Sequence, residues 1–226
     1  MVTFWIPADI EFFASMDWGH AKPGCIGWWA CLPEGRYHVI REWKFQWLAD
    51  DDIASGYHAR TKESGFKTVR YVAGDPSMWI RDGRNASRGQ SRAETFLRAR
   101  MPMRKAENAR EDGWSRLRSM LRVPTDDTGR PTGESPNLTI DASCTYLRRT
   151  IPAQRSDKTN ADDVDTSGDD HGGDMLRYGA MSRPHPTLRR FDVRPKAGTA
   201  GALLAELRDG LGRASVLGAQ NVVGAR

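Results

Sequence analysis

The segment from 169 to 178 carries the densest group of side chains able to bind a metal ion. Three carboxylates and one imidazole fall within six positions, at Asp169, Asp170, His171 and Asp174. Residues three or four apart share one face of a helix, so His171 or Asp170 can lie beside Asp174. Carboxylates so close repel each other unless a cation lies between them. Two interpretations follow: an acidic loop that caps a helix, or a divalent metal site.

Two further carboxylates follow apolar runs that are typical of buried strands. Asp17 ends the run 12–17, and Asp75 follows the run 67–73 and Gly74. Taken singly, each has a plain explanation, because Asp before Gly or Pro is common in turns. If the two runs are neighbouring parallel strands, about 5 Å apart, their carboxylates converge on one point. Together with Asp174 they would form a catalytic site.

The elements that position these residues are predicted from apolar spacing and turn signals. Segments 12–17, 24–32 and 37–43 have short connections, which predicts three antiparallel strands. A helix over about 50–64 then leads to the strand 67–73, which we expect to lie parallel to the first strand. The later elements are predicted as helices near 92–100, 105–122, 142–149 and 173–181, and as a strand at 138–140.

The net charge of +5 conceals a strong segregation of charge along the chain. Residues 81–122 contain twelve Lys or Arg and five Asp or Glu, whereas residues 157–174 contain seven Asp and one Lys. The first region is suited to phosphates and the second to cations, although arginine-rich helices can also simply solvate a surface. The basic side chains expected to bind DNA are Arg81, Arg84, Arg88, Arg92, Arg104, Lys105 and Arg110.

The remaining composition limits the class of protein. No run approaches the length of a membrane span, and the N-terminus lacks the pattern of a signal peptide, so we expect an intracellular protein that is not secreted and contacts no membrane. The three cysteines have no metal-binding spacing, and we expect buried thiols. We expect residues 1–184 to form one domain and residues 185–226 a Gly-, Ala- and Arg-rich tail, mobile or docked on a partner.

Four motifs in order resemble one protein family. They are Met-Asp-Trp-Gly at 16–19, Ala-Gly-Asp-Pro at 73–76, Asn-x-Arg-x-x-Gly at 108–113, and the segment 138–178 that closes with Asp-His-x-x-Asp-x-Leu-Arg-Tyr. The first two are weak singly, and the last is specific. The set, which covers residues 10–182, resembles the C-terminal nuclease domain of tailed-phage large terminase subunits, the viral DNA-packaging motors.

The resemblance implies an RNase H-like α/β fold, with a mixed five-stranded sheet of three antiparallel strands plus parallel strands, flanked by helices. It implies a Mg²⁺- or Mn²⁺-dependent endonuclease that cuts double-stranded viral DNA during packaging, in the host bacterial cytoplasm. By matched position, Asp17, Asp75 and Asp174 are the catalytic, metal-binding carboxylates, with Asp170 and His171 beside them as further ligands. The glycines before Asp174 depart from the family pattern and leave the rank of Asp170 against Asp174 open.

Two divalent ions about 3.5–4 Å apart would activate a water and stabilise the leaving oxygen. We expect little sequence preference, because no base-reading motif is present. The packaging ATPase normally precedes this nuclease, but the sequence has no phosphate-binding G-x-x-x-x-G-K-[ST] loop. The chain is therefore a domain of a longer protein or a standalone nuclease. Expected partners are duplex DNA, an N-terminal ATPase domain, and the portal or the small terminase subunit.

Two alternatives stay open at this point. The acidic triad also suits another RNase H-like nuclease, such as a junction resolvase or an enzyme that cuts RNA:DNA hybrids. A non-catalytic DNA-binding assembly module, with the Asp cluster as a surface patch, is the alternative outside enzymology.

Overall fold

Three antiparallel strands begin the part of the chain that the computed structural model describes, which comprises residues 10–65, 68–81 and 90–183. The strands are β1 (Glu11–Asp17), β2 (Gly24–Cys31) and β3 (Tyr37–Phe45). Short connections join them, the second through a 3-10 turn, η1 (Pro33–Gly35). Because antiparallel neighbours need only a short connection, this order of apolar runs folds into a meander.

Three parallel strands extend this meander on both sides. Helix α1 (Asp50–Glu63) crosses over to β4 (Val69–Gly74), which pairs with β1, and β5 (Met103–Lys105) pairs with β4. On the other side, β6 (Leu138–Ile140) pairs with β3. The strand order is β5-β4-β1-β2-β3-β6. The expected parallel pairing of the first and fourth strands is therefore confirmed.

The fold class predicted from the sequence, a mixed α/β sheet flanked by helices, is confirmed, but the sheet has six strands where five were expected. The additional strand, β5, lies mainly between the expected helices 92–100 and 105–122 and overlaps the second of them only at Lys105. The amide of Val72 donates to the carbonyl of Pro102 at 2.8 Å, which draws this segment along β4. Proline also lacks the amide donor that a helix needs. The helix, α3, begins only at Arg110 and runs to Leu121.

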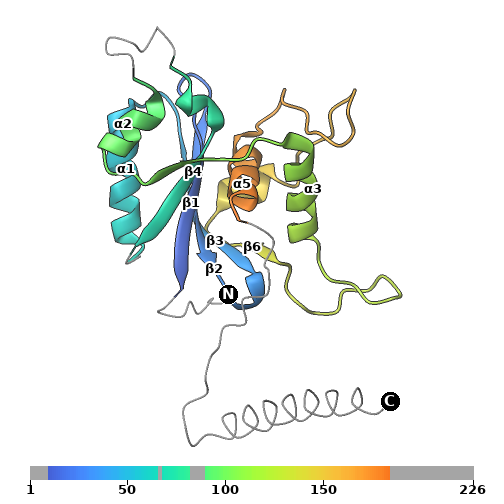
Figure 1. Cartoon of the computed structure of the whole chain (residues 1–226). Helices are drawn as coiled ribbons and strands as arrows, with labels where there is room; N and C mark the ends of the chain where they lie inside the picture. Colours follow the sequence, from blue (N-terminus) through green and yellow to red (C-terminus); the bar gives the residue numbers. More distant parts are fainter. Residues whose placement is uncertain (1–9, 66–67, 82–89, 184–226) are drawn as a thin grey trace, which may run out of the picture. The chain divides into compact units, whose positions relative to one another are not determined.

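Helices cover both faces of the sheet (Figure 1). On one face, α1 and α2 (Arg92–Arg98) pack against a core that includes Ile26 and Trp28. On the other face lie α3, α4 (Thr145–Thr150) and α5 (His171–Met181). Because side chains alternate along a strand, odd-numbered residues of β1 point toward α5, and Asp17 ends this row. Phe13, in the same row, lies in the core beneath α5.

Helix α5 lies unusually close to the sheet because two glycines leave room for it. A Cβ atom at Gly27 of β2 would lie 2.6 Å from the sulfur of Met175, and one at Gly179 of α5 would lie 2.3 Å from the ring of Trp29. The buried hydroxyl of Ser15 donates to the carbonyl of Met175 at 2.8 Å. These contacts fix α5 over the C-terminal end of β1.

Several expectations concern the rest of the chain. The tail at 185–226 lies outside the described residues, and the division into a domain and a tail stays a prediction. Within the described ranges, no helix is both long enough and apolar enough to cross a membrane. Cys25 and Cys144 are buried and Cys31 is partly buried, and all three are free thiols.

The close approach of α5 predicts an unusual effect of a glycine replacement. In an unconstrained helix, Gly→Ala stabilises by about 1 kcal/mol. We expect Gly179→Ala instead to lower the free energy of unfolding by about 1–3 kcal/mol, because the added methyl group overpacks against Trp29. Urea denaturation measures the change, with Ser119→Ala on the exposed face of α3 as the control. A variant as stable as the wild type would show that α5 does not need this spacing.

Candidate active site

The ends of β1 and β4 bring two of the predicted carboxylates together. The strands are parallel, with Met16 opposite Gly74, and the amide of Asp75 donates to the carbonyl of Met16 at 3.0 Å. Asp17 and Asp75 therefore leave neighbouring strands at the same edge of the sheet. This is the placement that the sequence predicted for them.

Helix α5 brings the remaining members to this edge. One cavity of about 530 Å³, the candidate catalytic cavity, is lined by all five residues predicted for the metal site: Asp17, Asp75, Asp170, His171 and Asp174. The rest of the lining comes mainly from the turn 18–22 and from Ser77 and Tyr178. Residues from three distant segments thus line the same cavity. Their assignment as metal ligands stays a prediction.

Asp17 is the most buried carboxylate of the cavity, with 7% of its surface exposed. Burial is the main cause that raises the pKa of its carboxyl, and the nearby charges of Asp174 and Asp75 add to the rise, for a net value of about 7. The imidazole Nδ1 of His171 lies 2.9 Å from Oδ2 of Asp17 and opposes this rise. The same hydrogen bond raises the pKa of His171, against the effect of burial. Asp17 and His171 therefore form one coupled proton-holding pair.

Asp174 is held by a buried arginine on its own helix. The Nε and Nη2 of Arg177, which is fully buried, donate to Oδ1 of Asp174 at 2.9 and 2.8 Å. The two Nη atoms of Arg177 also lie 3.3 Å from the side-chain oxygen of Asn108. The guanidinium is thus fixed from both ends, and it orients the Asp174 carboxylate.

A second arginine links this pair to the acidic loop. The Nε of Arg110 donates to both carboxylate oxygens of Asp163, at 3.1 and 3.0 Å, and its Nη1 lies 3.5 Å from Asp174. The hydrogen bond from Arg110 is the main reason that the pKa of Asp163 is lowered. Arg110, predicted as a DNA-binding residue, therefore already pairs with two carboxylates within the domain.

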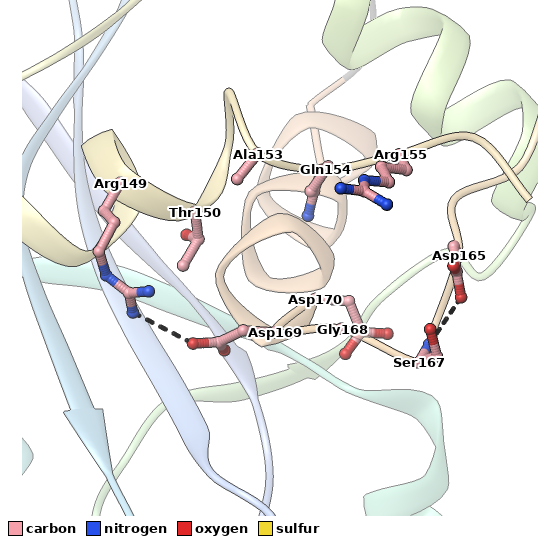
Figure 2. Close-up of a pocket in the computed structure, with 10 residues that line it drawn as sticks. All are labelled: Arg149, Thr150, Ala153, Gln154, Arg155, Asp165, Ser167, Gly168, Asp169 and Asp170. Atoms are coloured by element: carbon pink, nitrogen blue, oxygen red, sulfur yellow. Dashed lines mark hydrogen bonds and ion pairs between the residues drawn. The ribbon is translucent and has the colours of Figure 1, made fainter.

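The neighbouring aspartates have different surroundings. Asp75 accepts hydrogen bonds from the amide of Ser77 at 2.9 Å and from its hydroxyl at 2.6 Å. Asp169 contacts Arg149 at 3.2 Å (Figure 2), and it also contacts Lys44 at 3.4 Å. Within the cluster 169–174, Asp169 is therefore neutralised by basic side chains, and it does not line the catalytic cavity.

Asp170 lies between two cavities. It lines the catalytic cavity and also a second one of about 240 Å³, whose lining includes Gln154 and Arg155 (Figure 2). Burial raises the pKa of Asp170, and the charge of Asp174 adds to that effect. Asp174 has a fixed arginine partner, whereas Asp170 makes no side-chain hydrogen bond or ion pair with another side chain of the described residues, so the two aspartates differ in how firmly they are oriented.

The side chains of the cavity have the right chemistry for a hard divalent cation, but they are not spaced to bind one in this structure. Four carboxylates on one cavity are the oxygen ligands that Mg²⁺ and Mn²⁺ take. Among the described residues, however, no three acidic, His or Cys side chains are grouped closely enough to hold an ion. Each of Asp17, Asp75 and Asp174 instead contacts a protein donor. The chemistry of the donor set fits such an ion, but the side chains are not grouped around a shared point in this structure.

The predicted DNA-binding side chains lie in varied surroundings. Arg81 is exposed and pairs with Glu94 at 2.7 Å, and Arg92 lies over the ring of Trp18 at 3.7 Å. Arg104 and Lys105 are exposed on β5. Arg84 and Arg88 lie outside the described residues. The exposed members can contact a phosphate, whereas Arg92 and Arg110 already have partners within the fold.

Sequence reasoning assigned no role to Arg177, Asn108 or Ser77. Arg177 and Asn108 belong to the quoted motifs, but a motif does not say which carboxylate an arginine holds. The one available signal was spacing, because Arg177 follows Asp174 by three positions on a helix. Asn108 and Ser77 lie in segments whose approach to the site depends on tertiary packing.

Comparisons with known proteins bear on the fold. No protein-family model matches the chain, and no curated protein matches it. The nuclease domain of the P22 large terminase matches with a TM-score of 0.57 and 18% identity, over 80% of this chain and 86% of that one. The large terminase of a thermophilic bacteriophage matches with a TM-score of 0.55 and 16% identity, over 78% and 41%. The HK97 large terminase matches with a TM-score of 0.51 and 8% identity, over 79% and 40%.

The chain therefore has the fold of a phage terminase nuclease domain, as the motifs implied. It spans about two fifths of the length of the two full large terminases. The low identities make this a statement about the fold alone.

The pairing of Arg177 with Asp174 predicts a large loss of stability when the guanidinium is removed. We expect Arg177→Met to lower the free energy of unfolding by about 3–5 kcal/mol, because the variant leaves Asp174 without its buried counter-charge. Urea denaturation measures the change, and Arg130→Met on an exposed loop is the matched control. If both variants unfold at the same urea concentration as the wild type, Arg177 does not hold Asp174 in this way.

Proposed function

We propose that this chain is the nuclease domain of a phage large terminase, which cuts double-stranded viral DNA during genome packaging. The observation that carries the proposal is the convergence of Asp17, Asp75 and Asp174 on one cavity. They come from three separate segments and meet at the edge of a sheet with the terminase nuclease fold. We expect little sequence preference, because the described helices pack on the sheet and none is presented as a base-reading element.

In this proposal Asp17, Asp75 and Asp174 hold two Mg²⁺ or Mn²⁺ ions, and Asp170 and His171 lie beside them as further ligands. Bound there, the two ions supply an activated water and neutralise charge on the scissile phosphate. Asp17 would be the carboxylate shared by the two ions, since it ends β1, which pairs with β4 before Asp75, and it lines the same cavity as Asp174.

The chain's own residues would prepare this cavity for the reaction. The imidazole Nδ1 of His171 lies 2.9 Å from Oδ2 of Asp17, so the two groups can share a proton between these atoms. Arg177 donates to Oδ1 of Asp174, and among the described residues no side chain hydrogen-bonds to Oδ2. Tyr178 lines the cavity, and burial raises the pKa of its hydroxyl, so it stays a hydrogen-bond donor at neutral pH.

The partners follow from the same proposal. The chain matches only about two fifths of a full large terminase, and structures of that terminase hold ADP and ATP-gamma-S. We therefore propose that an ATPase domain lies N-terminal to this nuclease in a longer protein. Duplex DNA is the substrate, the portal or the small terminase subunit is a further partner, and the host bacterial cytoplasm is the location.

Loss of the carboxylates provides the direct test. We expect Asp17→Asn and Asp75→Asn each to reduce the cleavage rate at least about a hundredfold, because the ions that neutralise the phosphate lose a ligand. EDTA is expected to abolish cleavage by the wild type. Conversion of supercoiled plasmid in Mg²⁺ or Mn²⁺ is the measurement, with circular dichroism to verify folding.

Asp127→Asn, which changes an exposed carboxylate on a loop, is the matched control and is expected to cut normally. Full activity of Asp17→Asn or Asp75→Asn would remove that residue from the site. A parallel digest of four-way junctions and RNA:DNA hybrids separates the terminase function from other RNase H-like nucleases, because faster cutting of either would favour those enzymes. No cutting of any substrate, together with no Mn²⁺ binding by calorimetry, would favour a non-catalytic DNA-binding module.

Binding of duplex DNA is expected to weaken steeply with salt, because it rests on neutralising phosphates. For each phosphate contact, the slope of log K against log salt becomes about 0.9 more negative. We expect the double variant Arg104→Ala and Lys105→Ala to reduce this slope by about 1.8, and Arg130→Ala to leave it unchanged. Fluorescence anisotropy over a salt series in EDTA measures the slope. A flat wild-type dependence would contradict binding through the basic region.

A further inference from the structure

Two large hydrophobic side chains are far more exposed than others in the described residues. Trp47 and Ile80 each expose 66% of their surface, whereas Leu97 and Val123 expose 47% and 49%. Leaving a tryptophan in water forgoes a large part of the hydrophobic stabilisation that its burial would give. An exposed side chain of this size at a particular place is therefore a candidate contact with a partner.

Both side chains emerge at the edge of the sheet that carries the carboxylates. Cys25 of β2 pairs with Asp17 on one side and with Lys44 on the other, so the chain after Phe45 leaves β3 beside the site. Ile80 directly follows the 3-10 turn η2 (Pro76–Trp79), which begins after Asp75. In the strand order, β4 and β3 lie on opposite sides of β1, three strand spacings or about 14 Å apart. Trp47 and Ile80, the apolar rim, thus flank the candidate active site.

The backbone fixes Trp47 to the wall of the catalytic cavity. Its amide donates to the carbonyl of His20 at 3.0 Å, and the side chain of Gln46 donates to the carbonyl of Ala21 at 2.7 Å. The ring of His20 packs edge-on against the indole, with centroids 5.5 Å apart. His20 and Ala21 both line the catalytic cavity. The position of Trp47 is therefore set by the same turn that bounds the site.

Trp47 also has a backbone conformation that side chains disfavour. Its φ is +59°, in the left-handed region that costs an L-residue free energy and that glycine adopts readily. Packing does not recover this cost, because two thirds of the side chain is exposed. Strain of this kind is found at sites where a side chain is presented for function.

We propose that the apolar rim is a DNA-contacting surface, in which Trp47 and Ile80 pack against sugar and base faces on either side of the scissile phosphate. This inference rests on the proposed function. Apolar side chains inserted from a protein surface contact duplex DNA in its minor groove, and aromatic rings stack on bases where pairing is disturbed. Lys22, exposed on the turn that holds Trp47, supplies a charge for a neighbouring phosphate.

We favour DNA over a protein partner because the apolar rim adjoins the catalytic cavity. A duplex whose phosphate reaches Asp17 and Asp75 must pass over the residues that follow β3 and β4 at that edge. The catalytic cavity, which is lined by carboxylates, lies between the two members of the apolar rim. Trp47 and Ile80 therefore do not form one apolar patch. A protein interface of ordinary type needs a contiguous apolar centre.

The experiment measures affinity and its salt dependence separately. A fluorescein-labelled linear duplex is titrated with the full chain in EDTA, so that no cleavage occurs. We expect Trp47→Ala to raise Kd about 5- to 100-fold with an unchanged salt slope, because the change removes stacking and no charge. Trp47→Phe is expected to restore most of the affinity, and Ile80→Ala to weaken binding less than Trp47→Ala. Lys22→Ala is expected to lower the magnitude of the slope by about 0.9.

Two controls keep the result interpretable. Val123→Ala removes another exposed apolar side chain, beyond α3, and is expected to bind as the wild type does. Trp47→Gly relieves the backbone strain, so it is expected to unfold at or above the wild-type temperature and to bind as weakly as Trp47→Ala. Wild-type affinity in both Trp47→Ala and Trp47→Gly would overturn the inference and leave a protein partner as the explanation for the exposed indole. If the wild type itself bound no duplex, the proposed function would fall as well.

Discussion

Electrostatic repulsion among converging carboxylates is the constraint on which the site depends. Asp17, Asp75, Asp170 and Asp174 line one cavity, and each negative charge opposes ionisation of the others. A different partner stabilises each of three carboxylates. His171 contacts Asp17, the amide of Ser77 donates to Asp75, and Arg177 pairs with Asp174. The pKa of Asp17 is nevertheless raised to about 7, and that of Asp170 is also raised, chiefly because burial disfavours the charged form of both carboxyls.

Much of the fold was predictable because the chain's local signals agree with its tertiary structure. The first four strands alternate with clear turns and one crossover helix, so their order and direction follow from general rules. Strand β5 was not predictable, because three residues with two exposed basic side chains carry no periodic signal. Its pairing is dictated by β4 and by Pro102, which blocks a helix there.

For the candidate site, the residue types were easier to predict than their partners. The sequence placed Asp17 and Asp75 at strand ends and Asp174 on a helix, and the structure brings all three to one cavity. The resemblance named Asp170 and not Asp169 as a ligand, but the sequence could not show why they differ, because Arg149 and Lys44 approach Asp169 only in the folded chain. Likewise, the sequence could not show that Arg110, predicted to bind DNA, contacts Asp163 of a distant loop and Asp174 of α5.

The glycines of α5 tie the assembly of this centre to folding of the whole domain. Three of its eleven residues are glycine, at positions 172, 173 and 179, and each lowers intrinsic helix stability by about 1 kcal/mol. A helix this short and this weak does not persist alone in water, so docking on the sheet must stabilise it. Asp174 therefore reaches the other carboxylates of the cavity only when α5 docks on the sheet. Incompletely folded chains therefore lack the assembled acidic centre. Because α5 and the sheet fold together, any cutting would be restricted to the fully folded domain.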